Sequence, residues 1–362
     1  MRLALVGAGH AHLAVIAEAG RLRAAGLDPV LIAPATFDYS GLAGAVLSGA
    51  MIRPDASIDI ASLARAHGVE HRIGVVTAMD RAALTLTLRD GSAVPFDLVS
   101  FNVGSVVGDL PGTQTAVWPV KPLSNLFDLR RTLETELAAG RAPALVVAGD
   151  GPTGFEIAAS LIGLCERLGR TPDITLIGPE ADAGWAPSGA ARRLVRSLER
   201  RGLRRVRGSV VHHAEGEVWL KDGRARRCDH LVVATGLRAP PSTAAFDLPL
   251  DPLGRLRVSP TLQSPGDQTV FAAGDCAAIE GHPRPFAGVF GVRAAAVLID
   301  NLCASATGAP LRAYRPQSRW LAILDLGDGT GLAMRGRLWW AGRLALRLKR
   351  RLDLGFVKRS RA

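Results

Sequence analysis

Cysteine and aromatic residues are scarce in this chain of 362 residues. The four cysteines, Cys165, Cys228, Cys276 and Cys303, show neither a C-x-x-C nor a C-x-x-x-x-C spacing. This argues against a redox disulfide, a zinc site and a secreted disulfide framework. Aromatic residues make up 5% of the chain and are not interleaved with the arginines, as they are in many nucleic-acid-binding surfaces. We therefore expect neither a metal centre nor a nucleic-acid partner.

Long uninterrupted apolar runs are also absent. No run reaches the roughly 18 residues that a membrane-spanning helix needs. The first residues have the early arginine and the apolar residues of a signal peptide, but Gly7, Gly9, His10 and His12 interrupt them. A strand, a turn and a helix explain these positions better. We expect a cytoplasmic protein, either soluble or held peripherally at the inner face of the cytoplasmic membrane.

The length and the apolar content of the chain favour a folded protein of several domains. With 48% apolar residues, a chain of this length predicts two or three domains with sizeable cores. Forty glycines predict many tight turns. The net charge of +11 comes mostly from arginine, and most of the 44 basic residues lie from position 192 onward. This asymmetry predicts an anionic partner for the C-terminal half, which by charge alone is a phosphate-bearing ligand, a lipid surface or a nucleic acid.

A strand, glycine turn, helix and second strand occur in this order twice. "RLALVGAG" leads into "HAHLAVIAEAGRLRAAG" and then "PVLIAP", and "APALVVAGDGPTGFEIAASLIGLCERLG" leads into "DITLIGP". Each unit is followed by alternating strands with a hairpin signal, Asp90-Gly91 after the first and Asp222-Gly223 after the second. Two such units predict two nucleotide-binding domains.

The second glycine turn is the more complete fingerprint. In Gly149-x-Gly151-x-x-Gly154 the glycines allow a sharp turn, close approach to a pyrophosphate and close helix packing, and the helix start favours phosphate charge. The first turn has Gly7 and Gly9 but His12 in the third place. Three interpretations stay open for it: a nucleotide turn, a metal pair of His10 and His12, or a buried turn without chemistry. Alternate residues at a helix start do not share a face, which weighs against the metal pair.

Two further positions are informative. Asp275 follows the buried strand "VFAAG" and either accepts hydrogen bonds from a polyol or caps the next helix. The strand of the second unit ends in "LIGPE", where Gly178 stands at the place of a ribose-binding acidic residue. Arg192 and Arg193 either meet a 2′-phosphate or are solvated helix residues, so NADH and NADPH both stay open.

Together these motifs resemble a known family. The two fingerprints, "FNVGS", "VVATGLRAP" and "VFAAGDCA" are similar to the two-dinucleotide-binding-domain flavoproteins, the pyridine nucleotide-disulfide oxidoreductase superfamily. The resemblance is nearest to type II NADH dehydrogenases and sulfide:quinone reductases. It is nearer still to NADH-dehydrogenase-like proteins fused ahead of selenide, water dikinase, through "GAGHAHL", "YSGLAGAVLSG", "VKPLSNL", "PFAGVFGVRAA" and "YRPQSRWLAILDLGDG".

The resemblance implies an α/β fold with two Rossmann-like domains of the three-layer ββα type, the second inserted in the first, and a short C-terminal α/β extension. It implies an FAD-binding domain over residues 1–112 and 256–312 and an NAD(P)H-binding domain over 113–255. Residues 313–362 would form a hairpin and a basic amphipathic helix. A homodimer is a further implied possibility for such a protein.

The resemblance also implies site residues. FAD would be held by Gly7, Gly9, His10, Ala11, His12, Ala33, Pro34, Val76, Asn102, Val103, Gly104, Gly274, Asp275, Gly288 and Val289. The nicotinamide nucleotide would be held by Gly149, Gly151, Pro152, Thr153, Gly154, Gly178 and Gly236. The candidate catalytic residues are Lys121, placed nearest the flavin, and Glu156.

The implied activity is hydride transfer from NADH or NADPH to flavin N5 and electron transfer to a second acceptor, without a redox disulfide. The acceptor would be a quinone or a small sulfur or selenium compound. Two features depart from the family: "GVFGVRA" lacks the glutamines of the quinone signature, and no cysteine matches those that attack sulfide. Cys276 is interpreted as a packing residue. The alternative is a non-catalytic FAD-binding scaffold or redox sensor.

The C-terminal segment from Trp339 onward also has a predicted structure. Trp339 and Trp340 precede a segment whose helical wheel places apolar and charged residues on opposite faces. This helix would either lie at a membrane surface, cover the flavin domain or form a dimer contact. The apolar face would hold Ala341, Leu344, Ala345, Leu348, Leu352 and Phe356, and the charged face Arg343, Arg347, Lys349, Arg350 and Asp353.

Overall fold

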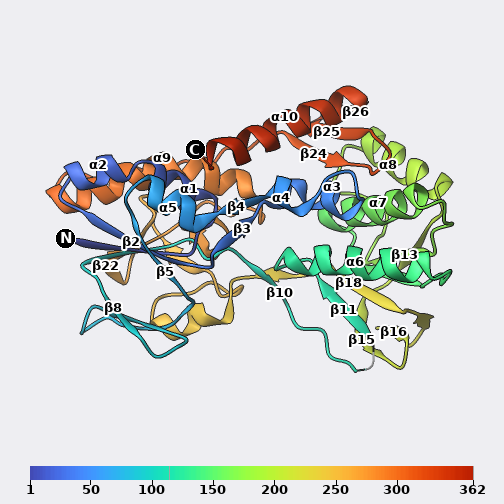
Figure 1. Cartoon of the computed structure of the whole chain (residues 1–362), viewed down its shortest axis with the longest axis horizontal. Helices are drawn as coiled ribbons and strands as arrows, with labels where there is room; N and C mark the ends of the chain where they lie inside the picture. The colour runs from blue at the N-terminus through green and yellow to red at the C-terminus, as the bar shows by residue number, and fades with distance from the viewer. Residues whose placement is uncertain (114, 362) are drawn as a thin grey trace.

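The computed structural model describes residues 1–113 and 115–361 and has two α/β bodies side by side (Figure 1). The first body is built on a six-stranded sheet in the order β21-β22-β9-β1-β2-β5. All neighbouring pairs are parallel except β21 with β22. Its strands are β1 (Arg2–Val6), β2 (Asp28–Ala33), β5 (Glu70–Ile73), β9 (Leu98–Phe101), β21 (Gln263–Ser264) and β22 (Asp267–Ala272).

Helices pack on this sheet because their apolar residues face it. β1, β2 and β9 are buried over nearly their whole length, which explains their continuous apolar sequences. α9 packs against α1 and α2. The helices of this body are α1 (His10–Ala17), α2 (Ala19–Ala24), α5 (Ile60–Ala66) and α9 (Gly288–Thr307).

The second body has a fully parallel five-stranded sheet in the order β11-β18-β12-β13-β14. Its core is separate from that of the first body. The strands are β11 (Ala116–Pro119), β12 (Leu145–Ala148), β13 (Ile174–Gly178), β14 (Leu203–Arg207) and β18 (His230–Val233). The helices are α6 (Ser124–Ala138), α7 (Pro152–Arg167) and α8 (Ser188–Arg200).

Each body carries a small antiparallel sheet with the expected hairpin turn. Asp90-Gly91 joins β7 to β8, and Asp222-Gly223 joins β16 to β17. The strands are β6 (Val76–Asp80), β7 (Thr85–Leu88), β8 (Ala93–Pro95), β15 (Val210–Ala214), β16 (Glu217–Leu220) and β17 (Ala225–Arg227).

The second body is inserted in the first, as the family resemblance implies. The first sheet takes strands from both sides of the second sheet in the chain, and the two crossing segments pair as β10 (Val106–Val107) with β19 (Leu237–Arg238). The limits predicted at residues 112, 255 and 312 stay predictions. The remaining short elements are β3 (Thr36–Asp38), η1 (Ser40–Leu42), α3 (Ala43–Leu47), α4 (Arg53–Ala56), β4 (Ser57–Asp59), η2 (Pro241–Phe246), β20 (Leu256–Val258), η3 (Gly274–Cys276) and β23 (Ala277–Ile279).

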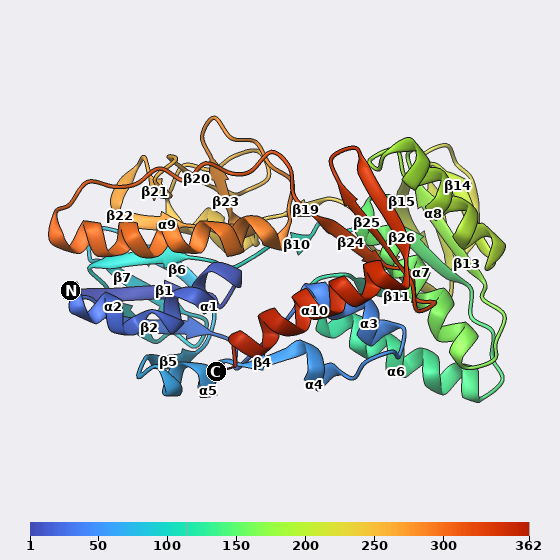
Figure 2. The same cartoon turned by 90° about the horizontal axis from the view of Figure 1, so that it is seen from above.

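The C-terminal extension differs from the predicted hairpin. It is a three-stranded antiparallel sheet followed by a helix that lies across both bodies (Figure 2). The elements are β24 (Ala322–Asp325), β25 (Gly331–Arg335), β26 (Leu338–Gly342) and α10 (Arg343–Arg359).

The predicted faces of α10 are wrong in part. Lys349 and Asp353, expected on the outer face, are buried, whereas Leu344 and Leu352 are 71% and 50% exposed. The buried pair is stable inside because Lys349 Nζ donates to Asp353 at 3.1 Å and to the Gly41 carbonyl at 2.7 Å. The outer face of α10 therefore mixes leucines with arginines.

One described helix, α9, is long and apolar enough by length and composition to cross a membrane. Arg293 and Asp300 lie within this helix, so it is not an uninterrupted apolar run. Half of its most apolar window is buried, and it packs against α1 within the first body. A core helix of a folded domain passes the same test, so the finding is weak support for a membrane span.

The close crossing of α7 and the C-terminal extension gives a stability test. A Cβ at Gly163 would overlap with the backbone of Gly327, between β24 and β25. Gly163→Ala should lower the free energy of unfolding by about 1–3 kcal/mol because this backbone contact must open. The matched control is Gly20→Ala in α2, where a Cβ meets nothing within 4 Å and Ala should be neutral or stabilising. Denaturant unfolding of both variants measures the difference, and equal stability contradicts the packing described.

Candidate functional site

The first glycine turn is held by Asn102. Gly7, with φ +85°, turns the chain after β1, and Gly9 precedes the first helical residue of α1. The Oδ1 atom of Asn102 accepts from the N–H groups of Ala11 at 3.0 Å and His12 at 3.2 Å. Its Nδ2 donates to the Ala273 carbonyl at 2.6 Å. Asn102 thus joins the start of α1 to the ends of β9 and β22.

This arrangement alters the predicted role of the α1 start. Two of the amides expected to hold a pyrophosphate, those of Ala11 and His12, already donate to Asn102. Among the described residues, the His10 N–H at the same helix start has no acceptor. The first turn therefore offers fewer free amides than the motif alone suggests.

His12 is a structural residue. It is fully buried, and its Nδ1 lies 2.6 Å from the Gly7 carbonyl while its Nε2 lies 2.8 Å from Ser100 Oγ. A carbonyl only accepts, so Nδ1 carries the proton and Nε2 accepts from the Ser100 hydroxyl. Burial lowers the pKa of His12 to about 4. The neutral ring is fully satisfied and fastens α1 to β1 and β9.

His10 points into different surroundings from His12. Its ring lies against Phe37, Tyr39 and Phe356, with centroids 5.3 to 5.5 Å apart. A Cβ at Gly288 would lie 2.9 Å from its Nε2, so the starts of α1 and α9 meet at this ring. Burial lowers the pKa of His10 to about 4. The divergence of the two rings contradicts the metal-pair interpretation, and the described residues contain no group of three or more metal-ligating side chains.

Lys121 and Asp275 form an ion pair between the two bodies. Lys121, just after β11, lies with its Nζ 3.0 Å from Asp275 Oδ2 and 2.5 Å from Ser105 Oγ. Ser105 also donates to Asp275 at 2.8 Å. Burial would raise the pKa of Asp275, but the charge of Lys121 and these hydrogen bonds hold it below its usual value. The predicted Lys121 and Asp275 therefore come together as charged groups, while Ser105 was missed although it ends the quoted "FNVGS".

The segments around this ion pair are close-packed. Gly274 has φ +71°, and a Cβ there would crowd Asn102. Arg284 donates to the carbonyls of Gly274 and Ala277 at 2.9 and 3.0 Å, and its Nε is buried without a partner among the described residues. Gly104, with φ +75°, has open space beside it. The predicted Asn102, Gly104, Gly274 and Gly288 thus surround one region.

The second glycine turn is built differently. A Cβ at Gly154 would overlap with the Gly149 carbonyl, so only glycine fits the third place. The N–H groups of Thr153 and Gly154 have no acceptor among the described residues, and Pro152 has no N–H to lose. Gly236 follows β18 with φ +54° and open space beside it. The second turn therefore has two free amides that can bind an anion, whereas the corresponding amides of the first turn, those of Ala11 and His12, already donate to Asn102.

Glu156 does not face this turn. Its Oε1 accepts from the Asp325 N–H at 2.8 Å and lies 3.7 Å from Lys349 Nζ, so it joins α7 to the C-terminal extension. Burial raises the pKa of Glu156 even beside Lys349. The carboxylates of Glu156 and Asp353 raise the pKa of Lys349 although burial alone would lower it. The structure thus places the predicted catalytic Glu156 in a buried charge cluster rather than beside the nucleotide turn.

The other predicted positions lie at or just beyond strand ends, apart from Val289 in α9. Ala33 is buried and Pro34 exposed at the end of β2, where the Ala33 carbonyl accepts from His71 at 3.1 Å. Val76 is buried at the start of β6, and Gly178 ends β13. Val103 follows Asn102, and Val289 lies in the first turn of α9. Their roles toward a ligand stay predictions.

The four cysteines are free thiols, and three of them are buried. Cys276, next to Asp275, is fully buried with its Sγ near two carbonyl oxygens, and burial raises its pKa to about 11. Burial likewise raises the pKa of Cys165 to about 11 and that of Cys228 to about 12. These three thiols are protonated near neutral pH and are poor nucleophiles.

Known proteins share this chain's sequence pattern. A family model described as pyridine nucleotide-disulphide oxidoreductase matches residues 1–297. An NADH dehydrogenase-like protein of Mycobacterium tuberculosis is 29% identical over 293 residues, 74% of this chain and 71% of that protein. Ferroptosis suppressor protein 1 of Homo sapiens is 27% identical over 307 residues, 80% of this chain and 77% of that protein.

A solved structure shares the fold. The sulfide:quinone oxidoreductase of the hyperthermophilic bacterium Aquifex aeolicus matches with a TM-score of 0.80 and 18% identity, over 99% of this chain and 91% of that one. At this identity the likeness concerns the arrangement of the two α/β bodies. A fold with two Rossmann-like domains, expected from the sequence, is therefore confirmed.

The Asn102 contacts predict a large effect of removing its side chain. Asn102→Ala should leave two α1 amides without partners, remove the amide donor from the Ala273 carbonyl, and lower the free energy of unfolding by about 2–4 kcal/mol. Asn102→Asp keeps the acceptor but loses the donor and should be intermediate. Thermal unfolding of the three proteins measures the order, and a neutral Asn102→Ala contradicts the role assigned.

The depressed pKa of His12 predicts a pH dependence of stability. The unfolded imidazole has a pKa near 6.5, and the folded one about 4. The contribution is therefore complete above pH 6.5 and is lost as the pH falls toward 4, by about 1.4 kcal/mol per pH unit at most. His12→Gln, which can keep a hydrogen bond, should flatten the decline between pH 6.5 and 5 in denaturant titrations. An unchanged slope contradicts the assignment.

Proposed function

The chain belongs to the pyridine nucleotide-disulphide oxidoreductase family, oxidoreductases that use a flavin and a pyridine nucleotide, and we propose that its flavin is FAD, held by the first body. The second body would bind NADH or NADPH, and a quinone would accept the electrons. The observation that carries this proposal is the Lys121–Asp275 ion pair, which joins the two bodies where the starts of α1 and α9 meet.

The residues around that pair fit FAD. The fit rests on the His10 N–H without an acceptor, the open space beside Gly104, and the crowding of Gly274 against Asn102. The free N–H of His10 would bind the pyrophosphate, which would pass close to Gly7 and Gly9, whose own N–H groups donate to the Ile32 and Asn102 carbonyls. Asp275 would bind the ribityl hydroxyls, and the start of α9 at Gly288 would face the flavin pyrimidine. FAD supplies a two-electron carrier that accepts hydride from a nicotinamide and passes electrons onward.

Lys121 supplies positive charge at this place. Its ammonium is held by Asp275 and Ser105, so its position is fixed before any ligand binds. A fixed cation stabilises negative charge that develops on a ring beside it. Thr153 and Gly154 would bind the pyrophosphate of the nicotinamide nucleotide through their free amides and orient it toward the same region.

We propose a quinone rather than a sulfur or selenium compound as acceptor. The type II NADH:quinone oxidoreductase of Haemophilus influenzae is 29% identical over 147 residues, and the sulfide:quinone oxidoreductase shares the fold. Cys165, Cys228 and Cys276 have raised pKa values because they are buried, which disfavours thiolate attack on a sulfur substrate. We further propose that electrons pass to the quinone without a redox disulfide.

We also propose peripheral contact with an anionic membrane through α10. Its outer face carries the exposed Leu344, Leu352 and Leu354 between arginines, next to the exposed Leu338 and Trp340 of β26. Apolar residues set among arginines suit the boundary between lipid headgroups and acyl chains. A dimer contact is the competing use of the same face.

The proposed activity is tested by absorption spectra and rapid mixing. The purified protein should show bound FAD that NADH or NADPH reduces. Lys121→Met should slow reduction by about tenfold to a hundredfold, while Lys121→Arg, which keeps the charge, should slow it less. Wild-type rates in Lys121→Met contradict the role of the cation. Bound FAD that neither nucleotide reduces supports a non-catalytic scaffold or sensor instead.

The membrane contact is tested by cosedimentation with vesicles that contain phosphatidylglycerol. The protein should bind at low salt and detach as salt screens the arginines. The double substitution Leu344→Glu/Leu352→Glu should abolish binding, while Ile73→Glu, at an exposed position on β5, should not. If the double substitution instead converts a dimer to a monomer in light scattering, the face is a dimer contact.

A further inference from the structure

The second body has no acidic residue at the strand end where dinucleotide-binding domains usually have one. β13 ends at Gly178, and the next acidic residue, Glu180, is paired with Arg207 at 3.0 Å. In dinucleotide-binding domains an acidic residue about 20 positions after the glycine turn accepts a hydrogen bond from the ribose 2′-hydroxyl. A ribose at this strand end must therefore find another acceptor.

Asp150 occupies the space that a side chain at position 178 would need. This residue lies between the first two glycines of the second turn. A Cβ built on Gly178 would overlap with the Asp150 side chain. The N–H groups of Glu180 and Ala181 donate to Asp150 Oδ2 at 3.0 and 2.7 Å and fix it there. The carboxylate thus stands at the end of β13, although its residue follows β12.

The charge of Asp150 is not neutralised by its neighbours. It forms no ion pair with the described residues, and its Oδ1 accepts no hydrogen bond from them. The two arginines of β14 that reach this loop are engaged elsewhere. Arg205 donates to the Ala181 carbonyl and pairs with Glu199, and Arg207 donates to the Pro179 carbonyl and pairs with Glu180.

We propose that Asp150 binds the adenosine ribose of the nicotinamide nucleotide and makes the protein prefer NADH over NADPH. The inference rests on the proposed function. With the pyrophosphate at the free amides of Thr153 and Gly154, the ribose that extends toward the end of β13 meets Asp150. Its free oxygen accepts from the 2′-hydroxyl, whereas a 2′-phosphate brings like charge against the carboxylate.

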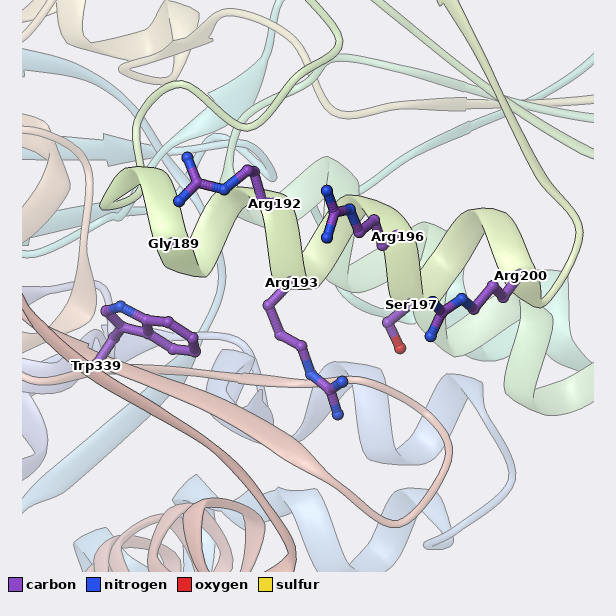
Figure 3. A pocket seen from close by; sticks show the side chains of 7 residues that line it. All are labelled: Gly189, Arg192, Arg193, Arg196, Ser197, Arg200 and Trp339. Atoms are coloured by element: carbon purple, nitrogen blue, oxygen red, sulfur yellow. The ribbon is translucent and has the colours of Figure 1, made fainter.

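The arginines of α8 are the competing determinant. Arg192, Arg193, Arg196 and Arg200 line a groove of about 310 Å³ together with Trp339, and they form no ion pair with the described residues. Figure 3 shows them spread along the helix, with Arg193 pointing toward the C-terminal strands. A 2′-phosphate held by these side chains would give the opposite preference, NADPH over NADH.

The test is flavin reduction by each nucleotide in the holoenzyme and its variants. The wild type should favour NADH by at least about tenfold, and Asp150→Asn should raise the NADPH:NADH ratio by on the order of tenfold. Asparagine can still accept both loop N–H groups but carries no charge. Asp182→Asn removes a charge from the same loop and should leave the ratio unchanged. The exchange Asp150→Gly/Gly178→Asp should restore the preference for NADH.

Three results of the flavin-reduction assays overturn the inference: a wild type that favours NADPH, a ratio that Asp150→Asn leaves unchanged, or NADPH use that Arg192→Gln/Arg193→Gln abolishes. A binding measurement that does not depend on electron transfer tests the role of Asp150 separately from the proposed function. Thermal shifts with ADP-ribose and 2′-phospho-ADP-ribose should show the same dependence on Asp150. That dependence without flavin reduction by either nucleotide contradicts only the proposed function. Binding of neither probe contradicts both.

Discussion

The side chain of Asn102 is the contact on which the first site depends. One carboxamide satisfies two amides at the start of α1 and the carbonyl at the end of β22, while its own backbone continues β9. These segments are far apart in the sequence, and each carries a group of the site: His10, Asp275 and Ser105. The same crowding explains why Gly7 and Gly9 lack side chains, because a Cβ at either would press on Asn102.

The two glycine turns differ in how the third position of the motif, Gly154 in one and His12 in the other, packs against the first glycine. In the second, the Gly149 carbonyl excludes any side chain at Gly154. In the first, the equivalent Gly7 carbonyl is a hydrogen-bond acceptor for His12. The histidine therefore does not make the first motif defective. It replaces close helix packing by a buried hydrogen-bonded ring, and Asn102 takes over amides that the second turn leaves free.

Features with a local signal could be predicted from the sequence. Apolar strands, glycine turns and the Asp90-Gly91 and Asp222-Gly223 hairpins all follow from short patterns. The resemblance implied a flavin-side place for Lys121 and for Asp275 separately, but not the ion pair that they form. The faces of α10 could not be predicted by periodicity, because Lys349 is buried by partners as distant as Gly41 and Glu156. The position of the Asp150 carboxylate could not be predicted either. It lies at the end of β13 only because Gly178 has no side chain to occupy that space.

The helix α10 touches both bodies. Lys349 bonds the Gly41 carbonyl and Asp353 accepts from Tyr39 at 3.0 Å, while Glu156 of α7 lies beside the same lysine. Separating the two bodies would expose the two carboxylates, Glu156 and Asp353, and the lysine that pairs with them in the interior. Any change in the relative position of the two bodies therefore carries the cost of breaking these buried charge contacts, and α10 ties the bodies together.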